Sequence, residues 1–243
     1  YACHTTRGFQ NLRKPGPNLT KVASKLDEQW VTDWIRDPRA IKASTWMPRV
    51  WYNSNTSEAE DVQRNEIEID ATVAYLFAHS SDHEFADLSP AQGDAERGQA
   101  LVESVGCLAC HITEDQTRLE AGTRRTFGQP LQNIGNKTSY EWVYDWVRDP
   151  THFSEETFMP DLRLTDSEAA DVSTYLMTLT GPAGRSAEAT YTATDVEDVL
   201  LDYARSIVPL AEAQELVDGM SGEEQILDLG RRVIGRYGCY SCH

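Results

Sequence analysis

Apolar residues recur at helical spacing along much of the chain, and several of these stretches begin at a recognisable helix start. One stretch places four apolar side chains on a single helical face, at Val62, Ile69, Val73 and Leu76. Capping-box signatures, in which Ser or Thr is followed three residues later by Glu, precede this stretch and two others. They lie at Ser57 to Glu60, Thr165 to Glu168 and Ser221 to Glu224. The pattern predicts a helix after each of them.

Shorter stretches predict helices over 28–36, 94–105 and 140–148. Alternation of apolar and polar residues, which would indicate strands, does not extend over any useful length. Glycine and proline mark a linker at 181–187, and Pro209 kinks the helical stripe beyond it or opens a second helix there. The stripe consists of Val196, Val199, Leu200, Tyr203, Ile207 and Leu210. The predicted fold class is all-α.

Two halves of the sequence resemble each other. Residues 16–50 align without a gap with 128–162 at a shift of 112, as from Trp30 to Trp142. The matched residues include Trp34 with Trp146, Arg36-Asp37-Pro38 with Arg148-Asp149-Pro150, and Met47-Pro48 with Met159-Pro160. Further on, Tyr75-Leu76 matches Tyr175-Leu176 at a shift of 100. We interpret the halves as tandem copies of one unit whose loops differ in length.

A third partial copy is predicted near the C-terminus, because residues 228–243 align with 96–111 at a shift of 132, including the glycine before the first Cys, Gly106 and Gly238. The sequence therefore predicts three regions. They are a first domain at 1–88, a second domain at 93–181, and a helical linker with the start of a third domain at 182–243.

Composition narrows the function classes. The chain has 243 residues, with Lys plus Arg at 22 against Asp plus Glu at 39, a net charge of -17. This charge argues against nucleic acid as a partner, since phosphate contacts need a basic surface. A basic redox partner protein fits the charge, and acidity for solubility explains it equally well. No apolar run is long enough to predict a membrane span in this segment.

The cysteines carry the most specific signal. Four of the five form Cys-x-x-Cys pairs followed at once by His, at Cys107, Cys110 and His111 and at Cys239, Cys242 and His243. A disulfide framework belongs to short, cysteine-dense chains, and a zinc ribbon brings its cysteine pairs closer together. A thioredoxin-like pair needs no following His. Covalent attachment of a c-type haem, with His as an iron ligand, explains both motifs.

Cys3-His4 resembles the second half of the same motif. We expect the chain to be an excerpt of a longer protein, with a further Cys before Tyr1 and further residues after His243. A true single-cysteine attachment at Cys3 is the alternative. Either way the sequence predicts three haem c groups, the first and third with incomplete sites in this chain.

These motifs, the Met-Pro steps and the Gly-Pro-Asn-Leu stretch at 16–19 resemble class I c-type cytochromes, here as tandem domains of a multihaem protein. The resemblance implies His/Met axial ligation, with Met47 and Met159 opposite His4 and His111 and with His243 binding the third haem. It also implies that the Pro17 carbonyl accepts a hydrogen bond from His4. The second copy departs from this pattern, because Gln129 aligns with Pro17.

Other side chains are weaker candidates. Trp34 and Trp146, with Trp30 and Trp142, either line the haem edge and donate to a propionate or belong to the core. Arg36 and Arg148 either bind propionates or interact with helix C-termini. The histidines without a counterpart are expected to be exposed, with His83 as a substitute ligand for a Met. These are His79, His83 and His152.

A filled iron coordination sphere favours electron transfer over enzymatic chemistry. The resemblance therefore implies an electron relay that works with redox partner proteins and neighbouring haem domains, in the periplasm or outside the cell. Two alternatives remain open: a module of an extracellular cytochrome filament, and a dihaem cytochrome c peroxidase-like enzyme. The two equivalent Met-Pro steps argue against the peroxidase.

Overall fold

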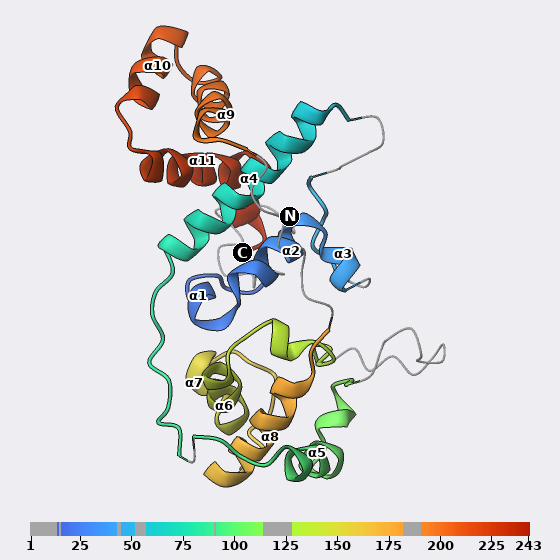
Figure 1. Ribbon diagram of the computed structural model, residues 1–243. Helices are drawn as coiled ribbons and strands as arrows, with labels where there is room; N and C mark the ends of the chain where they lie inside the picture. The colour runs from blue at the N-terminus through green and yellow to red at the C-terminus, as the bar shows by residue number, and fades with distance from the viewer. Residues whose placement is uncertain are drawn as a thin grey trace, which may run out of the picture. The chain divides into compact units, whose positions relative to one another are not determined.

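The computed structural model describes residues 14, 16–42, 45–51, 57–89, 91–113, 128–181 and 191–243. Every regular element in these residues is a helix, and they contain no strand (Figure 1). The predicted all-α fold class is confirmed. The chain divides into two compact units: unit 1 comprises Tyr1–Ala23, Glu28–Ser81 and Gly184–His243, and unit 2 comprises Ser24–Asp27 and Asp82–Ala183. No helix in the described part of the chain is long and apolar enough to cross a lipid bilayer.

Unit 2 is built around α5 (Ala95–Ser104) and α8 (Asp166–Thr178), which form its most extensive helix pair. α6 (Tyr140–Arg148) packs on α8, and α7 (Pro150–Phe153) follows it directly. The described residues of the unit also include two short 3-10 turns, η1 (Cys107–Ala109) and η3 (Ile134–Asn136). The buried core consists of Val102, Ile134, Trp142, Val143, Tyr144, Val147, Ala169, Ala170, Val172 and Leu176.

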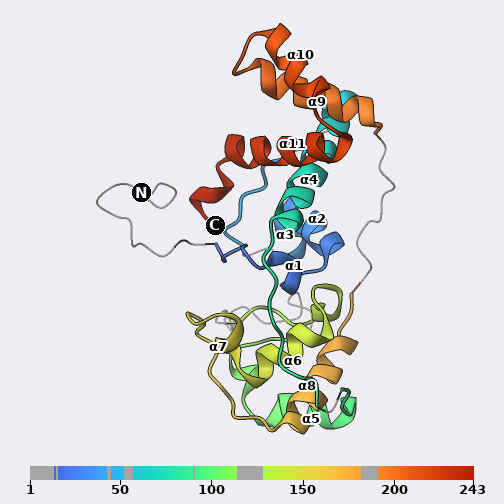
Figure 2. The ribbon, with the colours of Figure 1, turned by 90° about the vertical axis from the view of Figure 1, so that its left-hand side faces the viewer.

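Unit 1 combines helices from both ends of the chain. The N-terminal part supplies α2 (Glu28–Arg36), α3 (Pro38–Ile41) and α4 (Ala59–Ala78), while α1 (Val22–Lys25) is divided between the two units. The C-terminal part supplies α9 (Ala193–Arg205), α10 (Leu210–Asp218), α11 (Gly222–Tyr237) and the 3-10 turn η4 (Cys239–Ser241). α11 lies across α4 in both views, and this pair is the most extensive in unit 1 (Figures 1 and 2).

This arrangement differs from the predicted division, in which residues 182–243 stand apart as a linker and the start of a third domain. The reason is burial of apolar surface. α4 carries Ile67, Ile69 and Val73 on its buried face, and α9 and α11 pack against α4 with their own apolar residues. Those residues are Val196, Val199, Leu200, Leu229 and Val233. Their burial removes from water apolar faces that would be costly to expose.

Most predicted helices are confirmed. α2 and α6 have the predicted bounds, and α5 begins after Asp94, whose side chain accepts from the Arg97 N–H. Full capping boxes form at Thr165 and Ser221. The capping box predicted at Ser57 is wrong: α4 begins after Glu58, and no side chain caps it.

The stripe beyond the linker is divided between two helices. α9 ends at Arg205, and Pro209 precedes α10, so the second of the two predicted roles for this proline is confirmed. Ile207 and Leu210 do not extend the stripe as predicted, because the turn between the helices leaves their side chains exposed. A capping box at Thr192 was not predicted, because Asp195 takes the place of the usual Glu.

Candidate functional site

The first Cys-x-x-Cys-His segment of the described structure lies at the end of α5. Gly106 has a left-handed backbone, which lets the chain turn from α5 into η1 and bring Cys107 and Cys110 onto one short turn. The backbone N–H of His111 donates to the Cys107 carbonyl at 2.9 Å, which closes the segment. Both thiols and the imidazole therefore come from one compact turn.

The His111 ring is held by the loop that begins at Gly128. Its Nδ1 lies 2.7 Å from the Gln129 carbonyl, and the Gly128 N–H donates to the Cys110 carbonyl at 2.9 Å. A Cβ at Gly128 would lie 2.5 Å from the imidazole, so glycine is needed for this approach. Because the acceptor is a backbone carbonyl, Gln129 serves where the sequence pattern led us to expect proline. A carbonyl at Nδ1 places the ring proton there and leaves Nε2 to bind a metal.

Met159 lies thirteen residues after Trp146 in the sequence and is held by two hydrogen bonds. The Trp146 indole N–H donates to the Met159 sulfur at 2.9 Å, and the Met159 N–H donates to Thr157 Oγ1 at 3.2 Å. Trp142 stacks on Trp146 with ring centroids 5.0 Å apart. The Trp146 N–H therefore contacts sulfur, which was not predicted, while its ring packs against the buried core of unit 2. The tryptophan pair fixes where the thioether lies.

The cysteines of both motifs carry free thiols in the part of the chain that the structure describes. Cys107, Cys110, Cys239 and Cys242 are not joined in disulfides. Burial raises the pKa of the Cys107 thiol and of the Cys239 thiol. Free thiols at this spacing are available to form the two thioether bonds of a haem c.

Residues 95–180 match the family model described as Cytochrome c. The match covers both Cys-x-x-Cys-His at 107–111 and Met159. Comparison with curated proteins and with solved structures gives no match. The family match supports a c-type cytochrome domain in unit 2, and such a domain implies covalently bound haem c and haem-based electron transfer.

The residues of unit 2 fit a haem. The Trp142 Nε1–H is buried and has no hydrogen-bond partner among the described residues, which is costly unless a bound group accepts from it. A haem propionate is an acceptor of the right charge. Two thiols, an imidazole nitrogen and a thioether sulfur complete the set that attaches and ligates a haem c. Cys107, Cys110, His111 and Met159 are the residues that would hold it.

Unit 1 repeats this geometry with residues from both ends of the chain. His243 Nδ1 lies 2.8 Å from the Pro17 carbonyl, and the Gly16 N–H donates to the Cys242 carbonyl at 2.8 Å. The Trp34 indole N–H donates to the Met47 sulfur at 2.9 Å. Trp30 stacks on Trp34 with ring centroids 5.2 Å apart. The Pro17 carbonyl thus contacts a histidine as predicted, but that histidine is His243. Cys3 and His4 lie outside the described residues.

The two arginines contact carboxylates. Arg36 binds Glu66 through two guanidinium nitrogens and Asp33 through a third contact at 2.9 Å. Arg148 binds Asp166 at 2.5 Å. Hydrogen bonds to these carboxylates raise the pKa of both guanidinium groups. A propionate would have to compete with these ion pairs.

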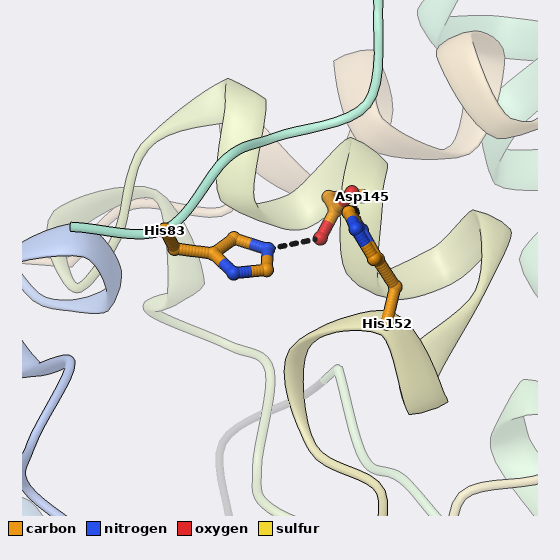
Figure 3. Close-up of side chains that lie close together, drawn as sticks. All are labelled: His83, Asp145 and His152. Carbon is orange, nitrogen blue, oxygen red and sulfur yellow. Dashed lines mark hydrogen bonds and ion pairs between the residues drawn. The ribbon is translucent and has the colours of Figure 1, made fainter.

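A second cluster of ligating side chains occurs in unit 2, away from the cysteine motif in sequence. His83 Nε2 lies 2.9 Å from Asp145 Oδ2, and His152 Nδ1 lies 2.7 Å from Asp145 Oδ1 (Figure 3). The Ala86 N–H also donates to Asp145 at 3.0 Å. His79 and His152 are exposed as predicted, but the prediction for His83 is wrong, because its side chain is only 4% exposed.

The three side chains could hold a metal ion, since their ligand atoms lie within 4.8 Å of one another. In the structure each Asp145 oxygen instead accepts from a histidine, so the cluster joins residues 83–86 to α6 and α7. His83 is therefore engaged here and does not stand in for a methionine. No sequence pattern predicts this cluster, because neither of its histidines recurs between the two halves.

Proposed function

We propose that the protein is a multihaem electron relay that transfers electrons between covalently bound haem c groups with His/Met ligation. The observation that carries this proposal is the pair of contacts that orient the axial ligands in unit 2, His111 to the Gln129 carbonyl and Met159 to the Trp146 indole. Three haem groups are proposed, at Cys3 with His4, at Cys107, Cys110 and His111, and at Cys239, Cys242 and His243.

The chain's own residues suit this task. Haem c supplies reversible one-electron chemistry at its iron. A backbone carbonyl at His111 Nδ1 keeps the imidazole in one tautomer and orientation through both redox states. An indole N–H at the Met159 sulfur holds the thioether in place, so no open coordination position is offered to a substrate. A filled coordination sphere favours a relay over a peroxidase-like enzyme.

Localisation and partners follow from the same proposal. Covalent haem attachment takes place outside the cytoplasm in class I c-type cytochromes, which supports a periplasmic or extracellular setting. The net charge of -17 supports a basic redox partner protein. Expression with and without an export leader tests the setting: haem should be incorporated only into the exported protein.

The decisive test replaces Met159. Met159→His should keep the haem six-coordinate and lower its reduction potential, because imidazole stabilises ferric iron better than a thioether does. Met159→Ala should remove the near-infrared charge-transfer band of that His/Met haem and admit exogenous ligands. Met177→Ala, in α8 and packed against the core, is the control and should change neither signal.

Haem mass per chain is measured on the same protein. A value of three haem groups is expected. An unchanged charge-transfer band in Met159→Ala would contradict the ligand assignment and would favour the peroxidase-like or the filament alternative. Absence of covalent haem would contradict the proposed function as a whole.

A further inference from the structure

The pairing of α11 with α4 in unit 1 matches the pairing of α5 with α8 in unit 2. Each pair depends on one glycine that allows the helices to touch. A Cβ on Gly98 would lie 2.0 Å from the Asp171 carbonyl oxygen, and a Cβ on Gly230 would lie 2.0 Å from the Ala71 carbonyl oxygen. Gly98 and Gly230 are aligned in the sequence at the shift of 132, and Ala71 and Asp171 at the shift of 100.

A buried polar network around Glu68 also joins the C-terminal segment to α4. The Glu68 carboxylate, only 3% exposed, accepts from the Tyr203 and Tyr237 hydroxyls at 3.0 Å each. It also accepts from the Trp51 indole at 2.9 Å and from Arg64 at 3.0 Å. Four donors satisfy a carboxylate that would otherwise be very costly to bury. Two of these donors come from α9 and α11, so the network is specific to this pairing.

Two further contacts extend the same interface. Arg64 binds Asp202 at 2.8 Å, and the Tyr191 hydroxyl donates to Asp70 at 2.6 Å. Burial, followed by the interaction with the Glu68 charge, raises the pKa of Tyr237 to about 12, so this hydroxyl remains a donor at physiological pH. Chance packing of an unrelated segment would not supply a partner for each of these buried groups.

We infer that the haem attached at Cys239 and Cys242 is bound by His243 on one face and by Met47 on the other. Unit 1 is then a circularly permuted cytochrome c domain, whose attachment motif follows its methionine in the chain. The inference rests on the proposed function, and it changes the expected partner of Met47 from His4 to His243. It is supported by the 2.8 Å contact of His243 with the Pro17 carbonyl, equivalent to that of His111 in unit 2.

Substitutions of the ligands in the haem-loaded full chain test the pairing. Met47→Ala and His243→Ala should each remove about half of the near-infrared His/Met charge-transfer band, since two such haems contribute to it. The double variant should lose no more than either single variant, because both residues serve one iron. His4→Ala should leave the band unchanged. His111→Ala should remove the other half, which shows that unit 2 is intact in the other variants.

A second test disturbs the helix pairing and leaves every ligand in place. Gly230→Ala should remove the unit 1 half of the band while Cys239 and Cys242 remain haem-modified in peptide mass analysis. Gly235→Ala is the matched control, since a Cβ at this position of α11 meets nothing within 4 Å. It should retain the whole band.

Each outcome has one meaning. If His4→Ala removes the half of the near-infrared band that depends on Met47, the permuted assignment is wrong. This holds whatever His243→Ala does to the band. Retention of the full band in Gly230→Ala would overturn it as well. Absence of covalent haem from the wild-type chain would instead refute the proposed function, whereas a Met47-dependent band that His243→Ala leaves unchanged would refute only this inference.

Discussion

Units 1 and 2 hold the same contacts around a histidine and a methionine but stabilise them by different means. In unit 2 the attachment turn, the carbonyl loop and the methionine follow one another along the chain between 107 and 159. In unit 1 the attachment turn at 239–243 meets a carbonyl loop that begins at Gly16. These short segments therefore determine their own geometry, whereas the order in which they follow one another along the chain can vary.

The supporting interactions differ at equivalent positions. Glu68 is buried in unit 1 and accepts from four side chains, whereas the aligned Glu168 is only partly buried and belongs to the capping box of α8. Conversely, Asp145 is buried in unit 2 between two histidines, while the aligned Asp33 makes an ion pair with Arg36. Unit 1 therefore buries Glu68, whereas unit 2 buries Asp145 and also Asp171, which aligns with Ala71.

Replacement of Glu68 should have the largest effect. Glu68→Ala leaves two tyrosines, an indole and Arg64 without their buried acceptor, so we expect unit 1 to lose about 3–5 kcal/mol of stability. Hydrogen exchange of the α11 amides should rise, while that of the α8 amides should not change. Glu168→Ala, the equivalent change in unit 2, should cost only about 1 kcal/mol. Equal effects in the two units would contradict the comparison.

Loss of the Asp145 carboxylate should cause the second-largest loss of stability. Asp145→Asn retains the shape of the side chain but removes the carboxylate charge. The Ala86 N–H and the two imidazoles lose a charged acceptor, so unit 2 should lose about 2–3 kcal/mol of stability. Asp33→Asn should cost unit 1 less than about 1 kcal/mol, because its ion pair is partly exposed. Urea unfolding of the two variants, followed by hydrogen exchange in each unit, makes the measurement.

Low pH should reduce the stability of unit 2 by protonating the same carboxylate. Although burial opposes it, hydrogen bonds from Ala86, His83 and His152 hold the pKa of Asp145 below its ordinary value of 3.8. A lowered folded-state pKa means that this stabilisation is complete above the unfolded pKa and is lost as the pH falls through the folded pKa. We expect unit 2 to be destabilised below about pH 4, and the pH dependence to be shallower in Asp145→Asn. Parallel pH profiles of wild type and variant would refute this.

The sequence predicted the local elements well. The all-α class and the bounds of α2 and α6 follow from periodicity and caps, which depend on neighbouring residues only. The pairing of α11 with α4 could not be predicted in this way, because it joins residues such as Glu68 and Tyr237 that are far apart in the chain. The contacts of Trp34 and Trp146 with sulfur were also missed. An indole spaced thirteen residues before a methionine carries no periodic signal.

The smallest expected effects concern the helix caps. Thr165 caps α8 through its own hydroxyl and the Glu168 carboxylate, whereas α4 begins at Glu58 without a side-chain cap. Thr165→Ala should therefore destabilise unit 2 by about 1 kcal/mol, because an N-terminal amide of α8 loses its acceptor. Glu58→Ser should stabilise unit 1 by about 0.5–1 kcal/mol, since Glu58 already has the extended backbone of a capping residue. Thermal unfolding of both variants against wild type measures the shifts. A loss of stability in Glu58→Ser would show that the start of α4 is held by contacts that a serine cap disrupts.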